Sequence, residues 1–168
     1  MALALIISTF VSLCGLTATS VYGYLISSNP QGFSTHFLLA VPSTFIALFS
    51  HCMTMFYFIG SGKWLKEQKD RYQLEIQVLP TILGIKKKYF GPAMLVILWT
   101  MVATILGGGA HTRAIPGWVH GVIGLAAVAS NLYLFIVQIR YLALNNMLMQ
   151  EVAVQVDKLE EARGQAGP

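Results

Sequence analysis

Long runs of apolar residues divide the chain into four segments. They cover residues 2–27, 36–59, 92–108 and 117–144. Each is close to the roughly 20 residues that a helix needs to cross a hydrocarbon core about 30 Å thick. Because backbone exposed to lipid must pair its polar groups internally, such segments cross a membrane as helices. The pattern therefore predicts an all-α integral membrane protein, built as a bundle of four transmembrane helices.

The apolar pattern changes after the fourth segment but does not stop. Alternating three- and four-residue steps, typical of a coiled-coil seam, connect Leu142, Asn145, Met149, Val152, Val156 and Leu159. We expect a four-span membrane domain over residues 1–149, and a cytoplasmic amphipathic helix to about residue 162 with a tail over residues 150–168. The stripe needs a partner, which is either this chain's own central segment or another subunit.

The longest polar stretch covers residues 61–91, between the second and third apolar segments. Pro80 and Pro92 are expected to interrupt it, since proline removes a backbone donor. Residues 63–78 are expected to form a helix, which either lies on the membrane surface or continues the second segment.

Charge gives the bundle a direction. Only 11% of the 168 residues are charged, against roughly 25% in soluble domains. Most cations lie between the second and third segments: Lys63, Lys66, Lys69, Arg71, Lys86, Lys87 and Lys88. The positive-inside rule places this loop, and with it both termini, in the cytoplasm, as in a bacterial inner membrane. Basic residues beside a membrane span contact anionic lipid, so we expect no nucleic-acid partner.

Histidines gather at the opposite end. His36, His111 and His120 fall at or near segment ends on the outer side, and His51 lies about 22 Å deeper than His36 at ~1.5 Å per helical residue. Ionisable groups in a membrane usually face the bundle interior. Haem iron accepts axial histidines, so His36 with His120, or with His111, could bind one haem b. His51 has no histidine opposite it and could hold only a five-coordinate haem or pigment.

Purely structural roles compete with ligation. On the fourth segment, His120, Gly124, Asn131 and Gln138 point in one direction at ~100° per residue. We expect Asn131 and Gln138 to make interhelical hydrogen bonds. His51 could equally be a buried imidazole bonded to a neighbouring helix, and the roles of His120 as ligand or packing residue stay open.

The outer loop after the third segment carries its own candidates. Gly107, Gly108 and Gly109 are expected to end the helix, because glycine is conformationally permissive. His111 and Arg113 follow, and with Trp118 they could hold a quinone headgroup or a haem propionate. An interfacial anchoring role is the favoured alternative, since Trp prefers that depth.

Other chemistry is disfavoured. His51, Cys52 and Met55 include soft copper ligands, but only His51 and Met55 share a helix face. Cys14 and Cys52 both lie in apolar segments, where free thiols are expected. The chain has no phosphate-binding glycine loop and no paired-cysteine motif. Carboxylates are absent from the four segments, which argues against a proton-coupled transporter.

These observations favour a small membrane subunit of a larger redox complex of energy metabolism, holding haem b or contacting quinone. Its role would be electron transfer or support rather than catalysis, and its partners would be other membrane subunits. In general plan the layout resembles the membrane anchors of respiratory enzymes. The alternatives are a structural or assembly subunit without a cofactor, and a small transporter or channel.

Overall fold

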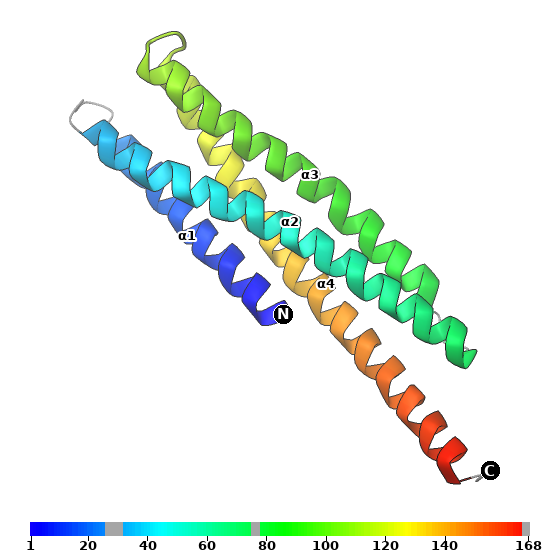
Figure 1. Ribbon diagram of the computed structural model, residues 1–168. Helices are drawn as coiled ribbons and strands as arrows, with labels where there is room; N and C mark the ends of the chain where they lie inside the picture. The colour runs from blue at the N-terminus through cyan, green and yellow to red at the C-terminus, as the bar shows by residue number, and fades with distance from the viewer. Residues whose placement is uncertain (26–31, 75–77, 166–168) are drawn as a thin grey trace.

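The computed structural model describes residues 1–25, 32–74 and 78–165, and four helices contain nearly all of them (Figure 1). These helices are α1 (Ala2–Leu25), α2 (Phe33–Tyr72), α3 (Val78–His111) and α4 (Gly117–Gln165). Each is long and apolar enough to cross a membrane, as the sequence predicted. The predicted end of the first segment at residues 26–27 and the end of the tail at residues 166–168 lie outside the described residues.

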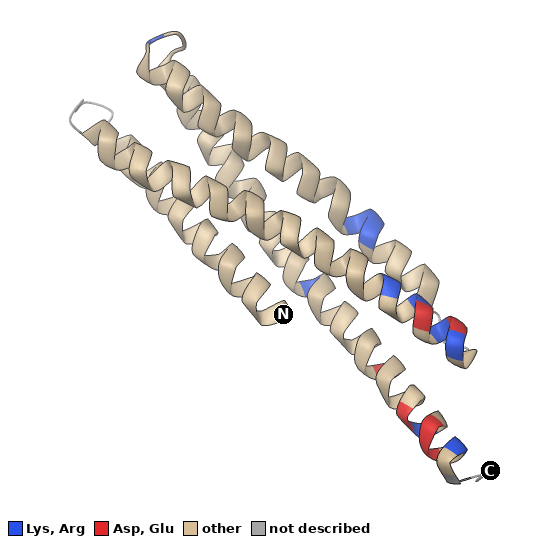
Figure 2. Cartoon of the chain, in the orientation of Figure 1, with Lys and Arg blue, Asp and Glu red and all other residues tan. Residues whose placement is uncertain are grey.

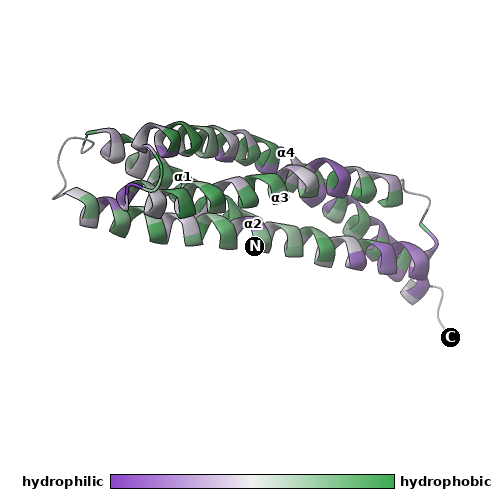
Figure 3. Ribbon diagram, turned by 90° about the horizontal axis from the view of Figure 1, so that it is seen from above, coloured by the Kyte–Doolittle hydropathy of each residue, from purple (hydrophilic) through white to green (hydrophobic). Residues whose placement is uncertain are grey.

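The helices form an antiparallel bundle of two hairpins. Within the first hairpin α1 packs on α2, and within the second α3 packs on α4. Between the hairpins α2 contacts α3, α1 contacts α4, and α2 meets α4 across the middle. Apolar residues cover most of the length of the bundle (Figure 3). Charged residues gather at the end that holds the α2–α3 connection and the C-terminus, as the cation pattern predicted (Figure 2).

Two helices extend further than hydropathy indicated. The second helix continues without a break to Tyr72. Of the two alternatives for residues 63–78, a separate helix on the membrane surface or a continuation of the second segment, the structure therefore has the continuation over most of this range. The third begins at Val78, so the expected interruption at Pro92 is wrong and this proline lies inside α3. The reason is amphipathic packing, because Val78, Ile82 and Ile85 recur at helical spacing and are all buried.

The C-terminal apolar stripe packs on this chain's own helices. Leu148 and Val152 of α4 join a buried cluster whose other members come from α2, the turn after it and α3: Leu65, Leu74, Val78 and Ile82. Met149 and Val156 pack against the same group, which we call the inner cluster. The helix itself runs past the predicted end to Gln165. Of the two partners considered for the stripe, the structure therefore provides the one within the chain.

The two hairpins are copies of one arrangement. Ser61 and Asn145 are 84 residues apart in the chain and hydrogen-bond each other at 3.1 Å. The same shift carries the five buried side chains of α1 onto buried side chains of α3: Leu5, Thr9, Ser12, Leu16 and Thr19 correspond to Tyr89, Ala93, Val96, Thr100 and Ala103. Buried positions 43, 47, 50, 54, 58 and 61 of α2 likewise correspond to buried positions 127, 131, 134, 138, 142 and 145 of α4.

This correspondence defines a pseudo-twofold axis that runs along the bundle between α2 and α4. Parallel repeats related by an axis along the membrane normal are a known way of building membrane bundles. Residues that contact their own counterparts must lie on the axis. Ser61 and Asn145 mark it near the charged end.

Candidate functional site

His36 of α2 and His120 of α4 face each other at the outer end of the bundle. Their ring centroids are 6.1 Å apart and their planes are nearly perpendicular, at 85°. The two histidines correspond to each other under the repeat, so the pair lies on the pseudo-twofold axis. Of the two outer pairings that the sequence allowed, the structure brings together His36 and His120.

Each ring packs against a glycine of the preceding helix. A Cβ placed on Gly23 would lie 2.8 Å from Cε1 of His36, and one placed on Gly107 would lie 3.1 Å from Cε1 of His120. A larger residue would therefore displace the ring, because its Cβ would lie closer to the imidazole than ordinary packing allows. Gly23 and Gly107 are also counterparts under the shift of 84 residues. In both halves of the repeat, a glycine of the preceding helix therefore makes room for the histidine ring.

Each ring of this pair has a nitrogen without a hydrogen-bond partner. Nδ1 of His36 and Nδ1 of His120 are both buried, and neither has a hydrogen-bond partner among the described residues. A backbone carbonyl faces each ring, from Thr19 for His36 and from Ala103 for His120. Buried polar atoms without partners are rare in native structures and call for an explanation, such as a ligand or a functional role.

The other outer candidates do not join this pair. The His111 ring stacks on Phe33 at a centroid distance of 3.5 Å and an interplanar angle of 12°. This contact connects the end of α3 to the start of α2 and leaves His111 exposed. Arg113 is also exposed, in the left-handed region with φ of 59°. Trp118 is 71% exposed, which fits a residue at the membrane interface.

The predicted end of the third helix at the glycine run is wrong. The helix continues through Gly107, Gly108 and Gly109 to His111. One of these glycines is needed for close packing, since Gly107 supports His120, whereas a Cβ on Gly108 would meet nothing within 4 Å. The turn is instead closed by the Gly109 carbonyl, which accepts from the backbone N–H groups of Ala114 and Ile115.

His51 belongs to a separate hydrogen-bond network in the middle of the bundle, in which its Nε2 has a partner and its buried Nδ1 has none among the described residues. Its Nε2 lies 3.0 Å from Oδ1 of Asn131, and Nδ2 of Asn131 donates to Thr100 Oγ1 at 2.8 Å. His51 is 1% exposed. The imidazole is therefore bonded to a neighbouring helix, which is the structural alternative that the sequence allowed. The expected interhelical role of Asn131 is confirmed.

Gln138 is also used for packing between helices. Its side-chain nitrogen donates to Thr9 Oγ1 at 3.1 Å and to the Leu5 carbonyl at 3.3 Å, both on α1. Its interhelical role is confirmed. Oε1 of Gln138 and Nδ1 of His51 have no hydrogen-bond partner among the described residues, as is the case for Nδ1 of His36 and of His120. The outer pair is distinguished by its geometry, because its two imidazole rings face each other.

The same histidines do not make a site for a bare metal ion. Among the described residues, no group of three or more His, Cys, Asp or Glu side chains could hold one. The copper alternative at His51 is weakened further, since Nε2 of His51 faces Asn131 and Cys52 is a free thiol. The outer pair can supply two nitrogen ligands, which suits a metal that brings most of its own ligands.

Sequence reasoning missed the two glycines that hold the histidines. The available signal was the equal spacing of Gly23 to His36 and of Gly107 to His120. Comparisons with protein-family models, curated proteins and solved structures found no match to this chain. Its function therefore has to be argued from this geometry.

Proposed function

We propose that the chain is a membrane-embedded electron-transfer subunit that binds one haem b between His36 and His120. The observation that carries the proposal is the geometry of the two rings. Metal–imidazole bonds of about 2 Å on both sides of one metal separate two ring centroids by about 6 Å. The observed separation is 6.1 Å, on an axis where the two hairpins meet.

Several features fit a macrocycle better than a bare ion. Haem iron takes four ligands from the porphyrin and needs only two axial ligands from the protein. Gly124, one turn beyond His120, has open space beside it, because a Cβ there would meet nothing within 4 Å. A flat apolar ring needs this kind of space beside its axial ligands.

The chain's own residues would have distinct roles. His36 and His120 would bind through one nitrogen each, and Gly23 and Gly107 would let the rings approach the backbone. The carbonyls of Thr19 and Ala103 would orient the second nitrogens, as hydrogen-bond partners of ligating histidines commonly do. The bound group would supply reversible one-electron transfer, with the potential tuned by burial and ligand identity.

A single site near one surface supports a role within a larger complex. The inner half offers no second histidine pair among the described residues, since the axis there is occupied by Ser61 and Asn145. Electrons crossing the full membrane would therefore need a partner subunit or a quinone. Arg113, at the same end as the haem site, would contact a propionate or a quinone headgroup, whereas the His111 ring is stacked on Phe33.

The proposed setting is a bacterial inner membrane with both termini in the cytoplasm. The support is the charge asymmetry of the bundle, in which Arg113 is the cation at the histidine end and most of the others lie toward the opposite end (Figure 2). A reporter enzyme fused after residue 168 should be active only in the cytoplasm. A reporter enzyme inserted into the 112–116 turn should be active only outside. The reverse pattern would show that the proposed inner and outer sides of the bundle are exchanged.

A visible spectrum tests the haem. Purified full-length chain should show a low-spin b-type spectrum that sharpens on reduction with dithionite. His36→Ala and His120→Ala should each abolish it, because one axial ligand is lost. His111→Ala is the matched control, since it removes an imidazole at the same end that is not in the pair, and it should leave the spectrum intact. A folded preparation without haem, or a spectrum lost in His111→Ala alone, would refute the proposal.

The second candidate is a structural or assembly subunit without a cofactor. The hydrogen bonds that join His51, Asn131 and Thr100 favour it, since polar residues of this bundle can connect helices without a cofactor. In that case His36→Ala and His120→Ala would lower the stability of the fold without any spectroscopic change.

A further inference from the structure

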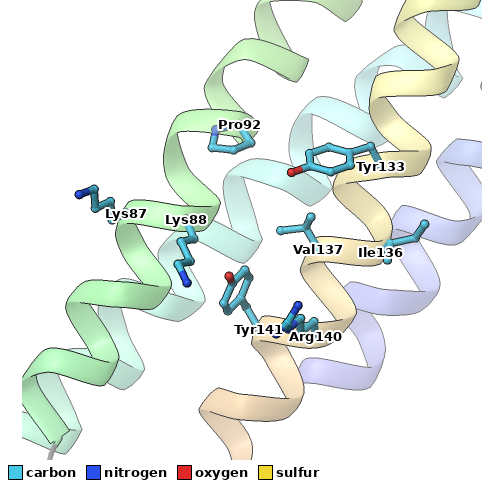
Figure 4. A pocket seen from close by; sticks show the side chains of 8 residues that line it. All are labelled: Lys87, Lys88, Pro92, Tyr133, Ile136, Val137, Arg140 and Tyr141. Carbon is cyan, nitrogen blue, oxygen red and sulfur yellow. The ribbon is translucent and has the colours of Figure 1, made fainter.

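A cleft opens between α3 and α4 near the charged end of the bundle (Figure 4). Its volume is about 440 Å³. Three cations and a set of apolar and phenolic side chains line it: Lys87, Lys88, Arg140, Tyr133, Tyr141 and Val137. Lys88 and both tyrosine rings lie between the two helices, whereas the Lys87 side chain extends from α3 away from α4 (Figure 4). The cleft faces away from α2, on the surface that would meet lipid.

The cations in the cleft lack acidic partners. Among the described residues the ion pair within 4 Å joins Lys63 to Glu67, on α2. Arg140 lies inside the fourth apolar segment, where an ionised side chain is costly. Lys88 and Arg140 line the same cleft, and an anion bound between them would offset the repulsion between their like charges. A negatively charged ligand from outside the chain would supply the partner that these cations lack.

The repeat provides an internal comparison for this cleft. The shift of 84 residues that relates Ser61 to Asn145 places Leu3, Ala4 and Phe56 at the positions of Lys87, Lys88 and Arg140. The first hairpin thus builds the same helix pairing without any charge. Because the fold does not require cations at these positions, their presence in the second hairpin points to binding.

We propose that this cleft binds the headgroup of an anionic phospholipid of the inner leaflet. Lys88 and Arg140 contact the phosphate through charge-assisted hydrogen bonds, and the phenol groups of Tyr133 and Tyr141 add donors. The acyl chains run along the groove past Val137 toward the membrane centre. Basic pockets between membrane helices on the cytoplasmic side suit such headgroups. The proposal depends on membrane insertion but not on haem.

Native mass spectrometry of the full-length chain tests it. The chain is released from nanodiscs that contain equal amounts of phosphatidylglycerol and phosphatidylcholine, and the retained lipids are counted. Wild type should retain phosphatidylglycerol selectively. The double variant Lys88→Gln/Arg140→Gln should lose about 30-fold in affinity, taking each cation near the surface as about fivefold.

The matched control is Lys63→Gln/Lys66→Gln, which removes the same charge from exposed positions of α2. It should keep the selectivity. Equal losses in both double variants would show diffuse attraction between charges and overturn the site. Unchanged retention in Lys88→Gln/Arg140→Gln would do the same. Millimolar inorganic phosphate should not displace the lipid, and displacement would overturn the assignment to a phospholipid. Far-ultraviolet circular dichroism confirms that each variant is folded.

Discussion

Gly15→Ala is a sharp test of how closely α1 and α2 pack. A Cβ on Gly15 would lie 2.3 Å from Oγ of Ser43 and 3.0 Å from its Cβ. Rotation about χ1 moves Oγ of Ser43 but leaves its Cβ in place, so relief of the contact with Cβ requires a shift of the helices. By contrast, a Cβ on Gly60 would meet nothing within 4 Å, which makes Gly60→Ala the matched control.

The two substitutions should have opposite signs. Alanine is intrinsically better than glycine in a helix by about 0.5–1 kcal/mol, so Gly60→Ala should raise the free energy of unfolding by that amount. Overpacking in a well-packed interior costs about 1–3 kcal/mol. For Gly15→Ala this cost exceeds the gain in helix propensity, and we expect a net loss of about 1–2 kcal/mol. The two variants should therefore differ by about 2 kcal/mol.

The free energies can be measured by unfolding the purified chain in mixed micelles with increasing dodecyl sulfate, followed by circular dichroism. A double-mutant cycle with Ser43→Gly isolates the contact, because this change removes both clashing atoms. In the Ser43→Gly background Gly15→Ala should no longer destabilise. If Gly15→Ala is as stable as Gly60→Ala, or if Ser43→Gly gives no relief, the close approach of α1 and α2 is wrong.

Three further predictions follow from other contacts. Asn131→Leu should lower the free energy of unfolding by about 1–2 kcal/mol, because it breaks two interhelical hydrogen bonds of ~0.6 kcal/mol each and removes the partner of His51 Nε2. Equal stability of the variant and the wild type in the same micelle assay would show that these hydrogen bonds do not stabilise the fold. Deleting residues 151–168 should leave the chain inserted but cost at least about 2 kcal/mol, because fully buried Val152 is lost from the inner cluster, and an unchanged unfolding curve would contradict this packing. The pKa of Tyr72 is raised, mainly by its hydrogen bond to the Glu160 carboxylate, which disfavours the phenolate; Glu160→Gln should lower this pKa in an absorbance titration of the phenol, and no change would rule out the contact.

Hydropathy alone was sufficient for the number of helices and for the end of the bundle that carries charge. Both properties are local, because crossing a membrane depends on the length and polarity of one segment at a time. The interhelical roles of Asn131 and Gln138 could be predicted too, since an amide inside a bundle has little else to bond. Helix ends were less predictable at α3, where the turns before Pro92 are amphipathic rather than uniformly apolar.

The tertiary structure decided which residues meet. From sequence, His36 could pair with His120 or with His111, because both lie at the same depth and rotation about each helix axis was unknown. Packing of all four helices fixes that rotation, and it places His36 opposite His120 while His111 stacks on Phe33. The cleft of Lys88 and Arg140 is likewise a product of two helices in register. Composition and periodicity are properties of one helix, whereas a site is made where several helices meet.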